Sequence, residues 1–209
     1  YRVPYPQVLL NDLIERVGVT GASRLLDVAC GPGRVALGLA PHVREIWALD
    51  LEPEMIHIAR IEAAKRGINT VTWMVGRAED LFAPPAWFDL MTIGDAFHRH
   101  DQRLVATRAF QWLRPGGCLA TFGSDGLMEG HEDWHQIVAA IARQLTEQVR
   151  PMTAGADMPK PGNGSAHYER VLRDAGFDGV IRVAFVKAYD WTIDTNFAYV
   201  VFIIWDRTR

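Results

Sequence analysis

The sequence predicts a single α/β domain over residues 1–209, built on a parallel sheet. Two observations predict this class. Short apolar, β-branched runs alternate with helical patterns from residue 24 onward, which is typical of strand–helix–strand units. A glycine-rich turn, Gly31-Pro32-Gly33, follows the first of these runs directly. One domain is consistent with the length, because single cores grow to about 250 residues.

The first half of the chain supplies five of the expected strands. They lie at residues 24–29, 45–49, 70–75, 88–93 and 118–122. Helices are expected at residues 6–17, 34–40, 53–66 and 102–113. Local signals place several ends: Pro53 begins the third of these helices, Gly67 ends it, and a Pro-Gly-Gly turn at 115–117 precedes the fifth strand.

The regular alternation stops after the fifth strand. We expect an inserted substrate-binding lid over residues 124–165, with a helix at 132–149 and then a loop that holds three Pro and three Gly. A helix at 168–175 and strands at 180–186 and 197–205 complete the domain. The last strand is apolar at nearly every position, which predicts burial on both faces inside the sheet.

Composition excludes several classes of protein. With 49% hydrophobic and 22% charged residues, the chain is typical of globular proteins. A net charge of −3 lacks the basic excess that nucleic-acid binding requires. No apolar run reaches the roughly 20 residues of a membrane span, and no secretory leader opens the sequence. Two cysteines are too few for a disulfide scaffold, so we expect a cytoplasmic protein without membrane partners.

The glycine turn predicts a small-molecule site. Gly31 and Gly33 allow a tight turn and a close approach of ligand at the start of the next helix. Together with Ala36 they also satisfy G-x-G-x-x-[GA], so an NAD-dependent oxidoreductase is an alternative. Asp50 ends the second strand, where its carboxylate would accept hydrogen bonds from the ribose hydroxyls of either cofactor. Asp27 would repel a pyrophosphate but attract a sulfonium, which favours S-adenosylmethionine, unless it only hydrogen-bonds the turn.

Five motifs follow one another along the chain. They are LLDVACGPGRVA at 25–36, LDLEPEMI at 49–56, G-x-A-E-D-L at 76–81, DAFHRHD at 95–101 and LRPGG at 113–117. With these motifs the chain resembles the class I S-adenosylmethionine-dependent methyltransferases over nearly its full length. The resemblance implies a Rossmann-like, seven-stranded, mostly parallel sheet with only the last strand antiparallel, and with helices on both faces.

The resemblance also implies a binding site for S-adenosylmethionine. It assigns Asp27, Gly31 and Gly33 to the methionine and sulfonium end, Asp50 to the ribose, Leu51 and Met55 to the faces of adenine, Ala78 and Glu79 to its edge, and Tyr5 to a position over the cofactor. A packed N-terminal aromatic is the alternative for Tyr5. Arg77 stands where the family often has Asp, so the acceptor for the adenine amino protons is open, and Glu79 is our candidate.

The segment after the fourth strand carries the candidate catalytic residues, Asp95, His98 and His100. It lies at the carboxyl edge of the sheet, where open α/β sheets bind ligands. By resemblance His98 lies beside the transferring methyl group. We predict that it acts as the base and passes its proton to solvent through Asp95 or His100. Arg99 and His100 replace apolar residues of the family, which indicates a more polar acceptor.

The lid carries the candidate acceptor site. We assign Glu129, His131, Glu132, Asp133 and His135 to substrate binding, with a solvated helix start as the alternative. Residues 131–135 also match the zinc-peptidase pattern H-E-x-x-H, but no third ligand is evident, so we expect no metal. Residues 124–164 hold six acidic and three basic residues. Such an acidic rim would attract a cationic acceptor.

The sequence therefore predicts methyl transfer from S-adenosylmethionine to a small, polar acceptor. An amine-bearing, aminoglycoside-like natural product of antibiotic biosynthesis is the first interpretation. O- or C-methylation of a phenol, quinone or other small metabolite is the alternative. An NAD-dependent oxidoreductase and a cofactor-binding regulator without catalysis are more remote. The choice between monomer and homodimer is left open.

Overall fold

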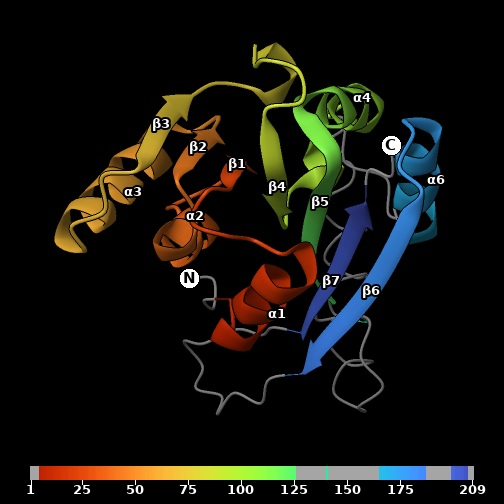
Figure 1. Cartoon of the computed structure of the whole chain (residues 1–209), viewed down its shortest axis with the longest axis horizontal. Helices are drawn as coiled ribbons and strands as arrows, with labels where there is room; N and C mark the ends of the chain where they lie inside the picture. The colour runs from red at the N-terminus through yellow and green to blue at the C-terminus, as the bar shows by residue number, and fades with distance from the viewer. Residues whose placement is uncertain (1–4, 126–139, 141–164, 187–198, 207–209) are drawn as a thin grey trace.

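The computed structural model describes residues 5–125, 140, 165–186 and 199–206 (Figure 1). Its strands are β1 (Arg24–Val28), β2 (Glu45–Asp50), β3 (Val71–Val75), β4 (Phe88–Gly94), β5 (Leu113–Asp125), β6 (Gly179–Val186) and β7 (Tyr199–Asp206). They form one sheet in the order β3-β2-β1-β4-β5-β7-β6. The first five strands of this order, β3, β2, β1, β4 and β5, pair in parallel with their neighbours, which confirms the predicted parallel sheet. β7 runs antiparallel to both β5 and β6.

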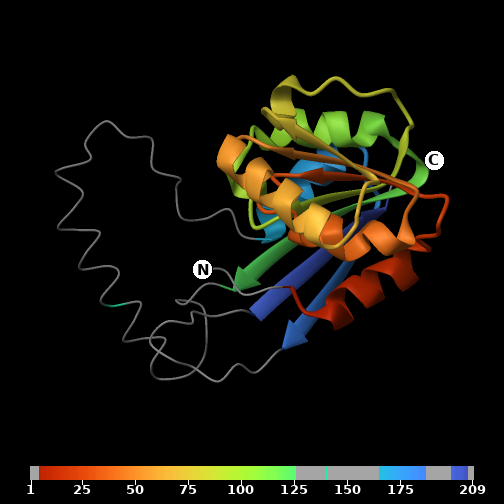
Figure 2. The same cartoon turned by 90° about the vertical axis from the view of Figure 1, so that its left-hand side faces the viewer.

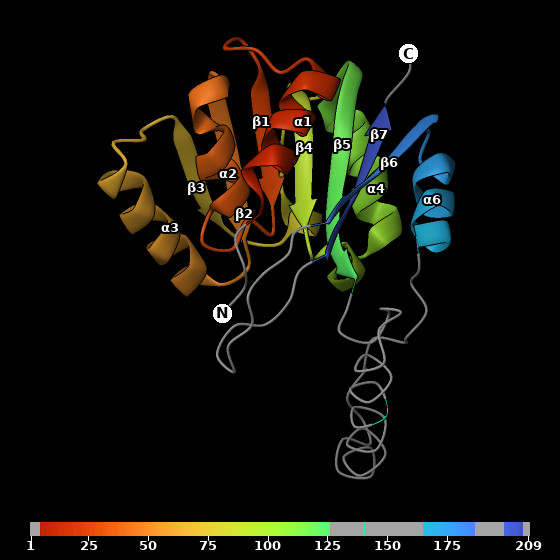
Figure 3. The same cartoon turned by 90° about the horizontal axis from the view of Figure 1, so that it is seen from below.

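Helices cover both faces of this sheet, as Figures 2 and 3 show. They are α1 (Gln7–Val17), α2 (Arg34–Leu39), α3 (Pro53–Lys65), α4 (Gln102–Trp112) and α6 (Ser165–Asp174), with short 3-10 turns η1 (Ala40–His42), η2 (Ala78–Asp80) and η3 (Phe97–Arg99). One buried cluster joins the sheet to α1, α2 and α3, and a second joins it to α4 and α6. Among the described helices, none is long and apolar enough to cross a membrane.

The ends of the first helices lie close to where local signals placed them. α3 begins at Pro53, whose fixed φ suits the first helical position. Gly67 follows its C-cap with φ 67°, a left-handed conformation that favours glycine. α1 buries Leu9, Leu10 and Leu13, as the apolar spacing predicted. Short-range patterns were sufficient here because each signal acts within one turn of helix.

The fifth strand is longer than predicted. β5 extends over Leu113–Asp125, whereas the sequence suggested residues 118–122. Leu113 pairs with Phe88, whereas the next pair joins Cys118 to Leu90, so the Pro-Gly-Gly turn is a bulge inside the strand. A Cβ on Gly117 would come within 2.9 Å of a backbone oxygen, which explains the glycine. α6 also begins at Ser165 rather than 168. The predicted lid helix at 132–149 lies outside the described residues, apart from residue 140.

The sheet order places a ligand site. β1 pairs with β2 on one side and β4 on the other. The chain adds β2 and β3 on one side of β1, and then crosses to add β4 and β5 on the other side. Helices after β1 and β2 therefore cover one face, and the helix after β4 covers the other. The loops at the carboxyl ends separate at this point and leave a crevice, which is where open α/β sheets bind ligands.

Candidate active site

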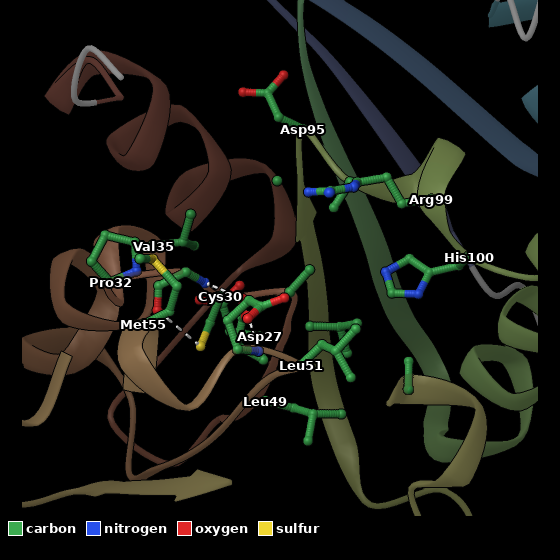
Figure 4. A pocket seen from close by; sticks show the side chains of 18 of the residues that line it. Asp27, Cys30, Pro32, Val35, Leu49, Leu51, Met55, Asp95, Arg99 and His100 are labelled. Carbon is green, nitrogen blue, oxygen red and sulfur yellow. Dashed lines mark hydrogen bonds between the residues drawn. The ribbon is translucent and has the colours of Figure 1, made fainter. Parts of the chain in front are cut away.

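A cavity of about 970 Å³ lies at this crevice. Its walls are the segments that follow β1, β2, β3 and β4, together with Tyr5 from the N-terminal segment. In the close-up of Figure 4, Pro32 and Met55 lie on one side, while Arg99 and His100 enter from the opposite side. Four loops distant in sequence thus converge on one site.

The turn after β1 has an unusual backbone. Ala29 and Gly31 have φ values of 53° and 55°, in the left-handed region. Such a conformation costs an alanine roughly 1–2 kcal/mol, and strain of this kind clusters at functional sites. Gly31 lines the cavity, and a Cβ built there would meet no atom within 4 Å. The missing side chain therefore leaves open room beside the backbone for a ligand.

Gly33 does not line the cavity. It has φ 78° and is buried, but it is not among the residues that line the cavity. A Cβ there would lie 2.6 Å from Cη2 of Trp73 and 3.3 Å from Cβ of Ala59. The glycine allows α2 to pack closely against β3 and α3, so the structure places it behind the binding surface rather than on it.

Asp50 is held rigidly at the end of β2. Its Oδ2 accepts a hydrogen bond from the Gly31 N–H at 2.7 Å, and its Oδ1 accepts one from the Glu52 N–H at 2.9 Å. The side chain lines the cavity, and each carboxylate oxygen has a second lone pair. Asp50 thus connects the loops after β1 and β2 while offering two acceptors to vicinal hydroxyls.

Asp27 both makes hydrogen bonds within the fold and lines the cavity. Its carboxylate accepts hydrogen bonds from the Ala36 N–H at 3.1 Å and the Thr92 hydroxyl at 2.7 Å, and it also lines the cavity. Burial, with a contribution from the Asp50 charge, raises the pKa of Asp27 to about 7 against the effect of those hydrogen bonds. A cationic ligand would favour the ionised form. Thr92, a polar residue in a buried strand, was the unused sequence signal for this pair.

An apolar section of the cavity lies beside Asp50. Leu51 is exposed, Met55 is half-buried and Ala78 is buried, and all three line the cavity. At its edge, Glu79 accepts a hydrogen bond from the Asp101 N–H at 3.0 Å. Burial alone would raise the pKa of Glu79, but backbone donors together with His100 and Arg77 lower it. The structure brings all the residues that the sequence assigned to adenine to one place.

The predicted catalytic residues are not all brought together. Asp95, at φ 48°, lines the cavity and its Oδ2 accepts a hydrogen bond from the Tyr5 hydroxyl at 3.3 Å. His100 also lines the cavity. His98 is exposed and is not among the lining residues. The N-terminal Tyr5 does lie at the cavity, and its ring also contacts Phe122.

The sequence reasoning missed other parts of the wall. Gly94, Arg34 and Cys30 line the cavity as well. A Cβ on Gly94 would come within 2.5 Å of the Tyr5 hydroxyl oxygen, so this glycine admits Tyr5. A glycine at the end of the fourth strand was the available signal. Burial raises the pKa of the Cys30 thiol, which keeps it neutral.

The acceptor residues assigned to the lid, Glu129, His131, Glu132, Asp133 and His135, lie outside the described residues. The same is true of the H-E-x-x-H match. In the part of the chain that the structure describes, no group of three His, Cys, Asp or Glu residues could hold a metal ion.

The cavity suits S-adenosylmethionine. Gly31 leaves open room where a Cβ would otherwise protrude, Asp50 offers two fixed acceptors, and apolar Leu51 and Met55 adjoin them. Asp27 adds a carboxylate whose ionised form a cation stabilises. Asp50 thus suits the ribose hydroxyls, the apolar side chains suit a flat base, and Asp27 suits a sulfonium.

Comparison with known proteins supports the same cofactor. Residues 25–117 match the family described as "Methyltransferase domain". The ubiquinone biosynthesis O-methyltransferase of Xylella fastidiosa (strain M23) is 36% identical over 114 residues, which cover 54% of this chain and 46% of that protein. The chain thus matches about half the length of this relative.

Two solved structures share the fold. YcgJ from Bacillus subtilis has a TM-score of 0.68 at 16% identity, covering 98% of this chain and 100% of that one. A phosphoethanolamine N-methyltransferase from Haemonchus contortus, in complex with phosphomonomethylethanolamine and S-adenosylhomocysteine, has a TM-score of 0.61 at 18% identity, covering 85% and 38%. The chain therefore shares the fold of these two structures, and residues 25–117 match a methyltransferase domain. These matches and the cavity support S-adenosylmethionine as the cofactor.

Proposed function

We propose that this protein transfers a methyl group from S-adenosylmethionine to a small-molecule acceptor bound in the same cavity. The observation that carries the proposal is Asp50, whose carboxylate is fixed by the Gly31 and Glu52 N–H groups beside an apolar section of the wall. When bound, the cofactor supplies an electrophilic sulfonium methyl group.

The residues of this chain contribute alignment and charge. The glycine turn and Asp50 orient the cofactor, so that little reorganisation is needed before attack. Asp27 places negative charge near the sulfonium end. At the opposite wall, Asp95 is our candidate for receiving the acceptor's proton, because its carboxylate lines the cavity. His98 remains the candidate from the sequence, and its exposed position makes it the weaker of the two.

Two classes of acceptor are candidates, an amine and a hydroxyl compound. An amine-bearing, aminoglycoside-like acceptor rests on the acidic residues of the lid, which lie outside the described residues. A hydroxyl acceptor is favoured by Arg99, whose side chain makes no ion pair within the described residues and extends over the cavity in Figure 4. A guanidinium there would repel a polycation and stabilise a developing oxyanion. The relative named above is an O-methyltransferase. We therefore infer a hydroxyl-bearing acceptor, with the amine as its competitor.

A labelled-methyl assay tests the proposal. The purified chain is incubated with S-adenosylmethionine labelled at the methyl group and a panel of phenols, catechols, polyamines and aminoglycosides. We expect label in a phenol or catechol, and a loss of transfer in Asp50→Ala. Transfer to amines alone would overturn the hydroxyl acceptor. Absence of S-adenosylmethionine binding in the folded chain would overturn the proposed function itself.

A further inference from the structure

One atom of the cavity wall lacks a hydrogen-bond partner. In the described part of the chain, three buried side-chain polar atoms have none: Arg24 Nε, Trp87 Nε1 and His100 Nε2. Only His100 belongs to the cavity. Its side chain is 13% exposed, and a buried nitrogen without a partner carries a desolvation cost of about 1–3 kcal/mol. A ligand group that pairs with this nitrogen would remove that cost.

The surroundings of His100 determine what it offers to a ligand. Its Nδ1 lies 3.5 Å from Oε1 of Glu79. Burial lowers the pKa of His100, Glu79 opposes the shift, and the positive charges of Arg99 and Arg77 add to it. The imidazole is therefore neutral at pH 7 and carries a single proton. The Glu79 carboxylate favours that proton on Nδ1, which leaves Nε2 as a hydrogen-bond acceptor.

The place of His100 limits which ligand group it meets. Through Glu79 it adjoins the part of the cavity wall, Ala78 and Glu79, that the sequence assigned to the edge of adenine. A ribose held by Asp50 puts the base of the nucleoside into this apolar section. The amino group of adenine is a donor and needs an acceptor at that edge. Arg77 has donors only. In Glu79, Oε1 accepts the Asp101 N–H and faces His100, and Oε2 lies 3.6 Å from Nε of Arg77.

We propose that His100 Nε2 accepts a hydrogen bond from the amino group of the adenine ring, so that His100 selects adenosyl over inosyl ligands. Glu79 is the positioning residue that holds the required tautomer. The inference rests on the proposed use of S-adenosylmethionine. It assigns His100 to recognition of the cofactor, in place of the acid–base role predicted from the sequence.

Calorimetric titration tests the inference without any need for turnover. The ligands are S-adenosylhomocysteine and S-inosylhomocysteine, in which a carbonyl oxygen replaces the amino group. We expect the wild-type chain to prefer the adenosyl ligand by about tenfold or more, since a mismatched pair leaves polar groups unpaired. In His100→Ala the two affinities should come within about threefold of each other. The exposed neighbour provides the matched control, and His98→Ala should keep the wild-type preference.

A second measurement needs no variant. Below the pKa of His100 its Nε2 carries a proton and becomes a donor, which suits the inosyl oxygen and not the adenosyl amino group. Glu79, Arg77 and Arg99 are the other charged groups near the imidazole. The adenosyl preference of the wild-type chain should therefore shrink as the pH falls through the lowered pKa of His100. His100→Gln, which retains a side-chain acceptor, should keep part of it at pH 7.

The outcomes separate the two proposals. If the wild-type chain binds neither ligand, the proposed function fails. If it binds S-adenosylhomocysteine but His100→Ala keeps the full preference, only the role of His100 fails. A wild-type chain that binds the two ligands with equal affinity at pH 7 contradicts the role of His100 even if the variants do not fold.

Discussion

The substitution Gly31→Ala tests the ligand site separately from the stability of the fold. The position has φ 55°, so alanine adopts a left-handed conformation at a cost of about 1–2 kcal/mol. The structure predicts no steric penalty in addition, because nothing lies within 4 Å of the new Cβ. The methyl group would occupy the space left for the cofactor. We therefore expect the free energy of unfolding to fall by about 1–2 kcal/mol and the affinity for S-adenosylhomocysteine to fall about tenfold or more.

Gly67 provides the matched control. It has φ 67°, no atom within 4 Å of a built Cβ, and a position after α3 that does not line the cavity. Gly67→Ala should lose a similar unfolding free energy and keep wild-type affinity. Denaturant titration measures the first quantity and calorimetry the second. Wild-type affinity in Gly31→Ala would refute the role of this turn, as would a stability loss far larger than that of Gly67→Ala.

Three further predictions concern the fold, the base and the pH dependence. Gly33→Ala should lower the unfolding free energy by about 2–5 kcal/mol, because left-handed strain adds to the clash with Trp73. A loss in denaturant titration equal to that of Gly67→Ala would contradict this prediction. Asp95→Asn should lower kcat by about 10²-fold, whereas His98→Ala should leave it within about threefold, and the reverse order would restore His98 as the base. The pKa of Asp27 is raised to about 7, so the folded state binds its proton more tightly than the unfolded state does. Stability without ligand should thus fall on the order of 1–4 kcal/mol as pH rises from 4 to 7, and Asp27→Asn should remove this dependence in denaturant titrations across that range.

Sequence patterns were sufficient for the parallel part of the sheet and for most helices. Alternation of β-branched runs with helical spacing, and end signals such as Pro53 and Gly67, act over a few residues and do not depend on the rest of the fold. The extra length of β5 was not predictable in this way. Whether a Pro-Gly-Gly turn ends a strand or bulges inside it depends on the pairing with β4.

The site residues were predictable where they lie at the ends of parallel strands. Asp27, Gly31 and Asp50 lie where parallel strands end, and they line the cavity as expected. Gly33 and His98 do not line the cavity, for nonlocal or geometric reasons. Gly33 faces Trp73, 40 residues further along the chain, which no local pattern reveals. His98 and His100 alternate in sequence, but His98 lies within the 3-10 turn η3 whereas His100 is its extended C-cap, and of the two only His100 lines the cavity.

We infer that the cavity at the carboxyl ends of β1, β2, β3 and β4 binds S-adenosylmethionine through Asp50. The most direct test titrates the chain with S-adenosylhomocysteine and, separately, with NAD, because the glycine pattern alone permits either. We expect saturable binding of one S-adenosylhomocysteine per chain, no comparable binding of NAD, and an affinity about tenfold or more weaker in folded Asp50→Ala. Binding of NAD in place of S-adenosylhomocysteine, or unchanged affinity in Asp50→Ala, would contradict it.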